Sequence, residues 1–327
     1  MKVCIYGAGA IGGHIGALLA QTDVEVSLIA RGAHLEAIKR DGLRLRAGGE
    51  EIVARVAASD DPGSFGRQDY VIATLKAHQL ADAAAAMQPL LGPQTAVVTA
   101  MNGIPFWYFY GLDGPHADAR IEAVDPGGVI WKTIGPERVI GCVVYTALEV
   151  MAPGIVAHES GDRYSLGEPG GAKSDRALAL GRAMSAAGLK APVKTNIRDE
   201  IWLKLWGNLS FNLISVLTLG NLEQMAGEPG TRTIARAMMI EAQSIAEALG
   251  VRFAVDVDRR MDMSKAVGPH KPSTLQDLER GRPMEIDALL TSVQEMGRLT
   301  ALPTPTIDLI LTLVQQRARN AGLYPAA

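Results

Sequence analysis

Residues 2–12, KVCIYGAGAIG, decide the fold. The run KVCIY is short, apolar and rich in β-branched residues, which favours a buried strand, and it ends at Gly7. The Ala- and Leu-rich stretch at 11–20 has helical character. The sequence therefore predicts a strand, a tight turn and a helix at the start of the chain.

The turn itself, GAGAIG, fits the pattern G-x-G-x-x-G, which gains weight because a strand precedes it and a helix follows it. Gly7 would allow the tight turn, Gly9 would let the backbone approach a pyrophosphate, and Gly12 would let helix and strand pack closely. The helix N-terminus would add amide donors and positive potential. We therefore expect a dinucleotide at Gly7, Ala8, Gly9, Ala10, Ile11 and Gly12. The alternative is a glycine-rich turn that binds nothing.

Strand-like and helix-like segments alternate after this motif, which favours a parallel α/β sheet. Strands are expected at 24–30, 51–58, 70–75, 95–101, 138–150 and 154–158, and helices at 34–41 and 79–91. After Thr195 strand signals almost vanish. Helix-compatible segments follow at 198–219, 231–249, 255–267, 274–279, 283–299 and 305–321. We predict an α/β domain at 1–195 and an all-α domain at 196–327.

Composition excludes several classes of protein. The chain of 327 residues is 48% hydrophobic, enough for two packed domains. Its 32 Lys and Arg against 35 Asp and Glu leave a net charge of -3, which disfavours a nucleic-acid binder. Two distant cysteines, Cys4 and Cys142, and the lack of a signal peptide predict the reducing cytoplasm. The apolar run 201–220 carries polar residues costly in lipid, so we expect a buried helix and no membrane partner.

Arg31 is a candidate for cofactor selection. Enzymes that prefer the non-phosphorylated nicotinamide cofactor usually place Asp or Glu at the end of the second strand, where this chain has Ala30-Arg31-Gly32. The planar fork of an arginine can pair with a 2′-phosphate. We therefore predict NADPH, the alternative being a solvated arginine at a helix start.

Lys204, Asn208 and Asn212 stand at i, i+4 and i+8 of an expected helix, within an arc of about 80°. Apolar residues occupy much of the remaining surface, so water should be scarce around this polar stripe. Desolvation tends to lower the pKa of a lysine, which suits a proton donor near neutral pH. Alternatively, Lys204 reaches solvent and the asparagines bond neighbouring helices.

Four further residues are candidates with structural alternatives. Ser273 could instead cap a helix with Gln276 as partner, and Glu285 could only complement a helix dipole. Lys76 and Asn102 follow the fourth and fifth strands of the first domain, and the carboxyl ends of such strands border the ligand crevice of an open α/β sheet. The six histidines show no ligand spacing, so no metal is expected.

Several motifs in order make the chain resemble the ketopantoate reductase (2-dehydropantoate 2-reductase) family over essentially its whole length. The matching stretches are GAGAIG at 7–12, Arg31, LKAHQ at 75–79, NG at 102–103, KLWGNLSFN at 204–212 and STLQDLERGRPMEID at 273–287. The resemblance implies a Rossmann-type doubly wound sheet followed by an all-α domain of the 6-phosphogluconate dehydrogenase C-terminal-like type. It also implies a possible homodimer through the helical domain.

The resemblance implies roles for the candidates as well. Lys204 would be the general acid, Asn208, Asn212 and Ser273 would bind substrate, and Glu285 would contact the cofactor. Asn102 and Lys76 would serve cofactor and substrate alike. Asn221 would correspond to another substrate-binding asparagine of the family, from whose spacing it is offset by one residue.

The implied reaction is the NADPH-dependent reduction of a 2-oxo acid, with ketopantoate as the expected substrate in pantothenate (coenzyme A) biosynthesis. Two departures leave a bulkier 2-oxo acid open: His270 stands where relatives often carry asparagine, and the aromatic run 106–110 could cap a pocket, contact a subunit or pack as core. A non-catalytic NADP-sensing regulator is the alternative outside catalysis. Retention of Lys204 with both asparagines argues against it.

Overall fold

The computed structural model describes residues 1–325, which form two compact units. The first, called here the sheet unit, comprises 1–101, 106–120 and 127–197. The second, the helical unit, comprises 102–105, 121–126 and the chain from 198 onward. Two short segments from the first half of the sequence thus belong with the helices of the second half.

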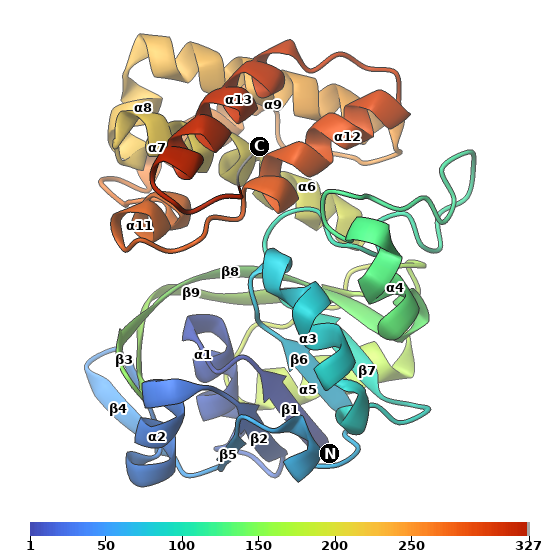
Figure 1. The fold of residues 1–327 in the computed structure, drawn as a ribbon, viewed down its shortest axis with the longest axis vertical. Helices are drawn as coiled ribbons and strands as arrows, with labels where there is room; N and C mark the ends of the chain where they lie inside the picture. The colour runs from blue at the N-terminus through green and yellow to red at the C-terminus, as the bar shows by residue number, and fades with distance from the viewer. Residues whose placement is uncertain (326–327) are drawn as a thin grey trace. The chain divides into compact units, whose positions relative to one another are not determined.

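A mixed sheet forms the centre of the sheet unit (Figure 1). Its order is β4-β3-β9-β8-β7-β6-β1-β2-β5 over the described part of the chain. The strands are β1 Lys2–Tyr6, β2 Glu25–Ile29, β3 Leu43–Ala47, β4 Glu50–Ala54, β5 Ala57–Ser59, β6 Tyr70–Ala73, β7 Ala96–Thr99, β8 Val139–Ala152 and β9 Ile155–Gly167. The run from β5 to β8 is parallel throughout. The predicted Rossmann-type sheet is confirmed.

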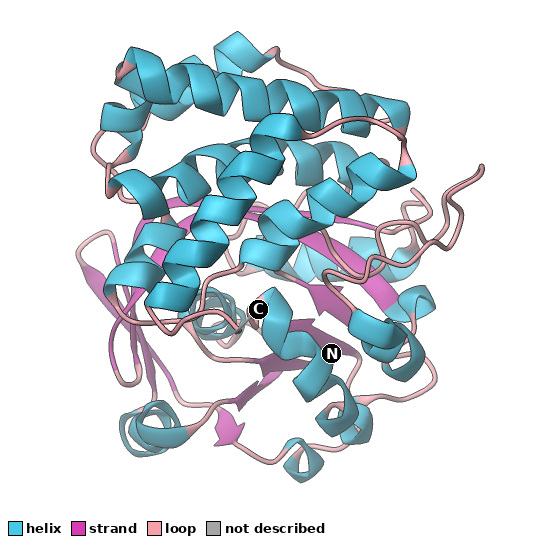
Figure 2. Cartoon of the chain, turned by 45° about the horizontal axis from the view of Figure 1, so that its top comes forward, coloured by secondary structure: helices cyan, strands magenta, loops and turns pink. Residues whose placement is uncertain are grey.

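Helices and short 3-10 turns link these strands (Figure 2). The helices are α1 Ala10–Leu19, α2 Gly32–Asp41, α3 Leu80–Ala86, α4 Val129–Thr133 and α5 Asp175–Ala186. The 3-10 turns are η1 Pro62–Ser64, η2 Ala77–Gln79, η3 Gln88–Leu90, η4 Pro126–Gly128 and η5 Pro136–Arg138. Strands β6 and β7 are buried at every position, as expected of parallel strands with both faces covered.

One expectation for the sheet unit is wrong, and one expected strand is longer than the sequence indicates. The strand expected at 51–58 is divided between β4 and β5, and β4 pairs in a hairpin with β3, which the sequence analysis missed. The cause is the Gly48-Gly49 turn, where both glycines have positive φ and reverse the chain. The strand expected at 154–158 continues as β9 to Gly167, paired with β8.

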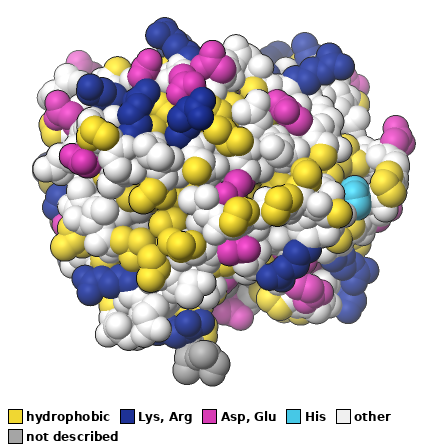
Figure 3. Space-filling model, turned by 90° about the horizontal axis from the view of Figure 1, so that it is seen from above, with side chains coloured by type: hydrophobic (Ala, Val, Ile, Leu, Met, Phe, Trp, Pro, Cys, Tyr) yellow, Lys and Arg dark blue, Asp and Glu magenta, His cyan; other side chains and the backbone are white. Residues whose placement is uncertain are grey.

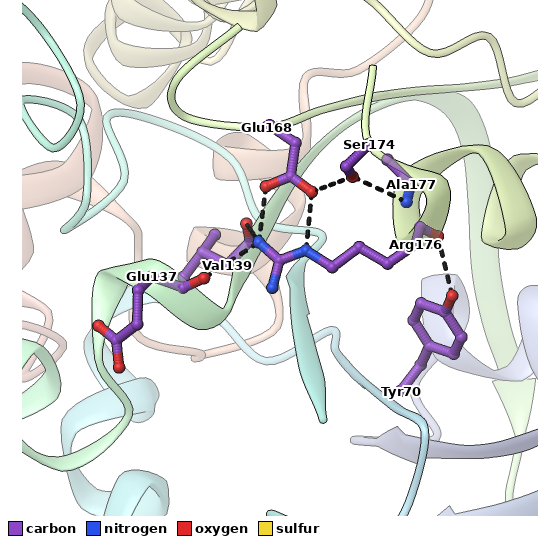
Figure 4. Close-up of polar contacts among 7 residues, drawn as sticks. All are labelled: Tyr70, Glu137, Val139, Glu168, Ser174, Arg176 and Ala177. Carbon is purple, nitrogen blue, oxygen red and sulfur yellow. Dashed lines mark hydrogen bonds and ion pairs between the residues drawn. The ribbon is translucent and has the colours of Figure 1, made fainter. Parts of the chain in front are cut away.

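Helix α5, which was not expected, is fixed to the sheet by a half-buried ion pair (Figure 4). Glu168, just beyond β9, accepts hydrogen bonds from Arg176 Nε at 2.7 Å and Nη2 at 2.6 Å. The Ser174 hydroxyl donates to the same carboxylate and caps α5 by accepting from Ala177 N. Tyr70 in β6 donates to the Arg176 carbonyl at 2.8 Å. The contacts tie the end of β9, the start of α5 and β6 together.

The predicted all-α character of the second half is confirmed. Its helices are α6 Ile197–Gly207, α7 Leu213–Thr218, α8 Leu222–Gly227, α9 Pro229–Ala248, α10 Val257–Ala266, α11 Ser273–Glu279, α12 Ser292–Leu299 and α13 Pro305–Asn320. Two π-helical turns interrupt them: η6 at Asn208–Asn212 and η7 at Asp287–Thr291. Helix α8 was not expected, and neither π turn was.

The aromatic run 106–110 packs largely as core of the sheet unit, one of the three roles left open for it. Phe106, Trp107, Tyr108 and Phe109 are all at most 4% exposed. Trp107 Nε1 donates to Thr99 Oγ1 at 2.9 Å. A Cβ on Gly141 would lie 2.6 Å from the Trp107 ring, so a glycine there makes room for the indole.

The surface drawn in Figure 3 shows apolar side chains interspersed with charged ones of both signs. On α9 and α13 the exposed apolar residues include Ile234, Ile240, Leu309 and Leu313. Within residues 1–325, no helix combines the length and the apolar character that a membrane span requires. Cys4 and Cys142 are both buried.

Candidate functional site

The glycine turn has the geometry that its sequence predicts. Gly7 adopts φ +103°, and a Cβ on Gly12 would lie 2.2 Å from the Gly7 carbonyl oxygen, so both positions exclude larger residues. A Cβ on Gly9, by contrast, would meet nothing within 4 Å. Gly9 is the N-cap of α1 and its backbone is exposed. The turn is thus closed on its packed side and open at Gly9, where a phosphate group could approach the helix N-terminus.

Neighbouring elements hold this turn in place. The Thr74 hydroxyl donates to the Gly7 carbonyl, and the Gly7 and Ala8 amides both donate to Ile29 O at the end of β2. His34 in α2 accepts from Gly154 N at 3.0 Å through Nδ1, so Nε2 carries the proton and donates to Ala8 O at 2.6 Å. The turn therefore rests on β2, on α2 and on the β8–β9 hairpin.

Arg31 lies where the sequence analysis placed it, between β2 and α2. It is the N-cap residue of α2, its side chain is exposed, and its charge acts on the Tyr6 hydroxyl. Burial raises the pKa of Tyr6, while the nearby Arg31 charge opposes that shift. An exposed guanidinium at this position could bind a phosphate. The same position also fits the alternative interpretation, a solvated arginine at the start of a helix.

The helical unit brings Lys204, Asn102 and Glu285 together, although Asn102 and Glu285 are 183 positions apart. Lys204 Nζ, on α6, donates to Asn102 Oδ1 at 2.7 Å. Asn102 Nδ2 in turn donates to Glu285 Oε2 at 3.2 Å. All three side chains are half-buried. The Asn102 amide thus joins an ammonium group to a carboxylate. Its oxygen faces the positive Lys204 and its nitrogen faces the negative Glu285, so the charges fix its orientation.

The segment carrying Asn102 docks on the π turn η7. Ile104 N donates to Ala288 O at 2.8 Å. Gly103 adopts φ +84°, and a Cβ there would lie 2.3 Å from the Ala288 carbonyl oxygen. This contact explains why Asn102, expected in the first domain after its fifth strand, belongs to the helical unit. The Asn-Gly dipeptide was the one local signal of such a turn.

The polar stripe on α6 does not continue as an α-helix, which corrects the predicted arc. From Asn208 to Asn212 the backbone forms η6, whose i→i+5 hydrogen bonds add a residue to the turn. The hydroxyls of Ser210 and Ser215 donate to the carbonyls of Trp206 and Asn212, both at 2.6 Å. Local side chains thus satisfy carbonyls around the π turn. η6 packs against η7, so both interruptions meet beside Lys204, Asn102 and Glu285, called here the Lys204 cluster.

Asn208, Asn212 and Ser273 form a second polar group. Asn212 Nδ2 lies 3.4 Å from Asn208 Oδ1 and 3.4 Å from Ser273 Oγ. Ser273 is the first residue of α11, whose N-cap is Pro272, and Gln276 donates to Lys271 O. The predicted capping box of Ser273 and Gln276 is therefore wrong. The proline before Ser273 takes the cap position, which leaves the hydroxyl directed at Asn212.

The other side of α6 is anchored by aromatic packing. Trp206 stacks on Phe253 with ring centroids 3.9 Å apart and planes 4° from parallel. Asp199, in the first turn of α6, accepts from Arg252 N at 3.0 Å, and burial raises the pKa of this carboxyl group. These contacts with the segment after α9 fix the helix that carries Lys204.

Two remaining candidates lie elsewhere. Asn221 caps α8 by accepting from Gln224 N at 2.9 Å, and Gln224 Oε1 accepts from Asn221 N at 3.0 Å, so a capping box accounts for this residue. Lys76 belongs to the sheet unit and is half-buried at the start of η2. Its predicted role stays a prediction. Among residues 1–325, no group of three or more His, Cys, Asp or Glu could hold a metal ion.

A dinucleotide fingerprint on a Rossmann-type sheet, with an all-α unit that holds an ammonium group against an asparagine amide, defines a class: nucleotide-cofactor-dependent oxidoreductases. Comparison with known proteins gives the family. The family model described as ketopantoate reductase PanE/ApbA matches residues 3–171, and the model of its C-terminal domain matches residues 196–318. The chain belongs to the ketopantoate reductase family and is an oxidoreductase.

Individual relatives agree with this assignment. A 2-dehydropantoate 2-reductase of Mesorhizobium japonicum is 56% identical over 99% of this chain and 100% of its own length. Another, from Halobacterium salinarum, is 27% identical over 98% and 100%. The structure of a candidate ketopantoate reductase from Ralstonia solanacearum MolK2 matches with a TM-score of 0.93 at 40% identity, covering 98% and 99% of the two chains.

The fold extends beyond proteins with that name. A D-mandelate dehydrogenase whose structure contains NADH and anilino(oxo)acetate matches with a TM-score of 0.83 over 99% of this chain and 100% of its own. At 23% identity this likeness concerns the fold alone.

Proposed function

We propose that the protein reduces ketopantoate, a 2-oxo acid, to the corresponding 2-hydroxy acid with NADPH. One observation carries the proposal: the half-buried Lys204 ammonium is held by Asn102 and linked through it to Glu285. A sensor of cofactor has no need of a positioned proton donor. The 56% identity to a 2-dehydropantoate 2-reductase supports ketopantoate as the substrate.

The residues of the glycine turn fit a dinucleotide. The packed positions Gly7 and Gly12 shape the turn, and the open position Gly9 leaves space for a pyrophosphate at the start of α1. We propose that the six residues from Gly7 to Gly12 hold the cofactor. The exposed Arg31 would hold the 2′-phosphate of NADPH through its guanidinium fork. When bound, the nicotinamide supplies a hydride to the substrate carbon.

Lys204 performs the other half of the reaction. As C2 of the oxo acid accepts the hydride, its oxygen gains negative charge, which the Lys204 ammonium stabilises before donating a proton to that oxygen. Asn102 orients Nζ by accepting one of its hydrogens. Burial of the neighbouring apolar side chains limits water around the developing charge.

The amides of Asn208 and Asn212 and the hydroxyl of Ser273 would bind substrate. They offer donors and acceptors without charge, so they can hold the hydroxyl group of ketopantoate and fix its orientation. We further propose that Glu285 contacts the cofactor and that Asn102 and Lys76 serve cofactor and substrate. Residues 1–195 would form the cofactor domain, and 196–327 the substrate domain. The homodimer and the cytoplasmic location stay predictions.

The test is a panel of 2-oxo acids of increasing bulk with NADPH and, in parallel, NADH. Ketopantoate should give the largest kcat/KM, and NADPH should be preferred. A larger kcat/KM for a bulkier oxo acid would identify that acid, rather than ketopantoate, as the substrate. If calorimetry shows tight NADPH binding but no oxo acid in the panel causes NADPH to be oxidised, the result would instead favour the NADP-sensing regulator.

A further inference from the structure

Tyr324 joins the segment after α13 to the π turn η7. Its hydroxyl donates to Asp287 Oδ1 at 2.5 Å and accepts from Gln315 Nε2, on α13, at 3.1 Å. Asp287 is the first residue of η7, and its Oδ1 also accepts from the Thr291 hydroxyl at 2.8 Å. All four side chains are half-buried. Two hydroxyls, one from within the π turn and one from beyond α13, thus hold the same carboxylate oxygen.

The segment that carries Tyr324 is fixed to α13, which aims the hydroxyl at η7. Leu323 N donates to Ala318 O at 2.9 Å, and the Arg319 guanidinium lies 5.4 Å from the centre of the Tyr324 ring. Burial, followed by the contacts with Asp287, raises the pKa of Tyr324 to about 12. At neutral pH the hydroxyl therefore keeps the proton that it donates.

The π turn decides what the Ala288 carbonyl binds. In a regular α-helix the amide of Ser292, four residues further on, would donate to Ala288 O. In η7 the Ser292 amide donates to Asp287 O instead, which is the i→i+5 pattern of a π turn. Ala288 O accepts from Ile104 N at 2.8 Å and from the Ser292 hydroxyl at 2.9 Å. The π turn therefore leaves this carbonyl to the segment that carries Asn102.

The docked segment orients the Lys204 ammonium. Ile104 bonds Ala288, and Asn102, two residues before Ile104, accepts from Lys204 Nζ. At its other end the Asn102 amide donates to Glu285, two residues before the start of η7. The position of η7 thus sets where the Asn102 amide lies and, through it, where Nζ points.

We propose that Tyr324 is a positioning residue for the proton donor: its hydroxyl braces Asp287 and so holds η7 in the π conformation on which the Asn102 segment docks. The inference rests on the proposed function, since it takes Lys204 to be the general acid. The effect of Tyr324 on the reaction passes through Asp287 and Asn102. Its loss should therefore slow the chemical step and leave the binding of substrate nearly unchanged.

An anchor for the end of the chain is the structural alternative. Tyr324 would then fix only the residues that follow α13. Its loss would lower Tm and leave kcat and the docking of Ile104 on Ala288 unchanged. Two measurements separate these roles: the split between kcat and KM, and the hydrogen-exchange rate of the Ile104 amide, which reports its bond to Ala288 O.

The experiment uses Tyr324→Phe, which deletes the hydroxyl and keeps the ring beside Arg319. With the best 2-oxo acid of the panel and saturating NADPH, kcat should fall about three- to tenfold, less than the roughly hundredfold that a misplaced reacting group can cost. The KM for the oxo acid should stay within about twofold of the wild type. The Ile104 amide should exchange about tenfold faster, the ratio that corresponds to one lost hydrogen bond to a charged group.

Tyr70→Phe is the matched control. It makes the same deletion in the sheet unit, where the Tyr70 hydroxyl donates to Arg176 O. This variant should keep the wild-type kcat and the wild-type exchange rate of the Ile104 amide, even where its Tm falls.

Two further variants sharpen the test. Thr291→Val removes the other hydroxyl on Asp287 and should reproduce the loss of kcat, and it replaces Tyr324→Phe if that variant does not fold. Combining Tyr324→Phe with Asn102→Ala should lower kcat no further than Asn102→Ala alone, because both changes act on the same contact with Lys204.

The outcomes separate this proposal from the proposed function. A loss of kcat together with faster Ile104 exchange supports the positioning role. A wild type that reduces the oxo acid, with a Tyr324→Phe variant that keeps its kcat, overturns that role and leaves the proposed function standing. A loss of kcat with unchanged Ile104 exchange also overturns it, because the effect then bypasses η7. A wild type that reduces no oxo acid overturns the proposed function, and the role of Tyr324 with it.

Discussion

The glycine turn and the Lys204 cluster are built in opposite ways. The turn consists of six consecutive residues held mainly by backbone hydrogen bonds and close packing, with Gly9 facing open space. The cluster joins side chains from segments 183 positions apart through side-chain hydrogen bonds beside two π turns. A binding turn can thus be local and rigid, whereas a proton donor among charges needs the tertiary structure of a whole unit to position it.

This contrast separates two kinds of failure. A change at the turn should affect cofactor affinity and leave the chemical step intact once cofactor is bound. A change in the cluster should affect the chemical step and leave cofactor affinity intact. Substitutions in each region therefore test whether the glycine turn and the Lys204 cluster act independently.

The largest effect is expected from Lys204→Ala. It should lower kcat by at least about a hundredfold, in line with the usual contribution of a positioned acid, because the oxygen of the substrate loses its proton donor. NADPH affinity, measured by calorimetry, should stay within about twofold of the wild type. If Lys204 only reaches solvent, the variant keeps its turnover and is as stable as the wild type or more so, and the general-acid role is excluded.

The second prediction concerns His14, whose burial should make the stability of the folded protein depend on pH. It lies on α1, contacts the Tyr164 hydroxyl at 2.7 Å and stacks on His158 with centroids 4.9 Å apart. Burial, with a smaller contribution from His158, lowers the pKa of His14 to about 4, while Asp162 opposes the shift. Between about pH 6.5 and about pH 4, His14 is therefore protonated in the unfolded chain but neutral in the folded chain. Because the unfolded state binds more protons, the free energy of unfolding falls as the pH drops through this window.

The expected loss over that window is about 3 kcal/mol, from 1.36 kcal/mol per pKa unit. His14→Asn removes the titrating group and keeps a side chain that can bond Tyr164. Urea unfolding at several pH values from 7 to 4.5 should show a shallower decline for this variant than for the wild type. Parallel declines would mean that His14 titrates normally in the folded protein.

Much of the sheet unit could be predicted from sequence because its signals are local. KVCIYGAGAIG fixes a strand, a turn and a helix within a few residues, and the apolar strands β6 and β7 stand out by composition. The hairpin of β3 and β4 was missed because its alternation LRLRA looks weakly apolar. Its pairing depends on contact with β9, more than a hundred positions away.

The cluster was only partly predictable. Lys204, Asn208 and Asn212 were found from their spacing, but the π turn that carries the asparagines follows from packing against η7 and from the serine hydroxyls, not from periodicity. That Asn102 would meet Glu285 depends on the Gly103 contact with Ala288, which no local pattern encodes. The family resemblance indicated which residues belong to the candidate site, and the structure gives their geometry.

Gly9→Val tests the openness of the turn. A valine side chain at Gly9 would enter space that is empty in the folded protein, so stability should be unchanged. The same side chain would overlap a bound pyrophosphate, and an overpacking cost of about 2 kcal/mol raises Kd for NADPH roughly thirtyfold. Gly12→Ala is the structural control and should destabilise the fold, since its Cβ would meet the Gly7 carbonyl. Unchanged NADPH binding in a folded Gly9→Val variant contradicts the proposed cradle.

Arg31→Ala tests cofactor choice within the same region. Loss of one charged hydrogen-bonding partner of a phosphate should raise the KM for NADPH about tenfold. The KM for NADH, which lacks that phosphate, should change little, and kcat with saturating NADPH should be retained. Equal changes for both cofactors would remove Arg31 from the 2′-phosphate site and leave it as an exposed arginine at the start of α2.

The smallest effect is expected from Asn221→Ala, which tests where the substrate site ends. Asn221 and Gln224 satisfy one another at the start of α8, so the loss of this cap should cost about 1 kcal/mol of stability. The KM for the oxo acid should stay unchanged, because the capping box already engages the Asn221 side chain. Asn212→Ala, measured alongside, should raise that KM instead, since its amide lies between Asn208 and Ser273. A rise in KM for Asn221→Ala without loss of stability would extend the substrate site to α8, and the cap would then be a resting arrangement that the substrate replaces.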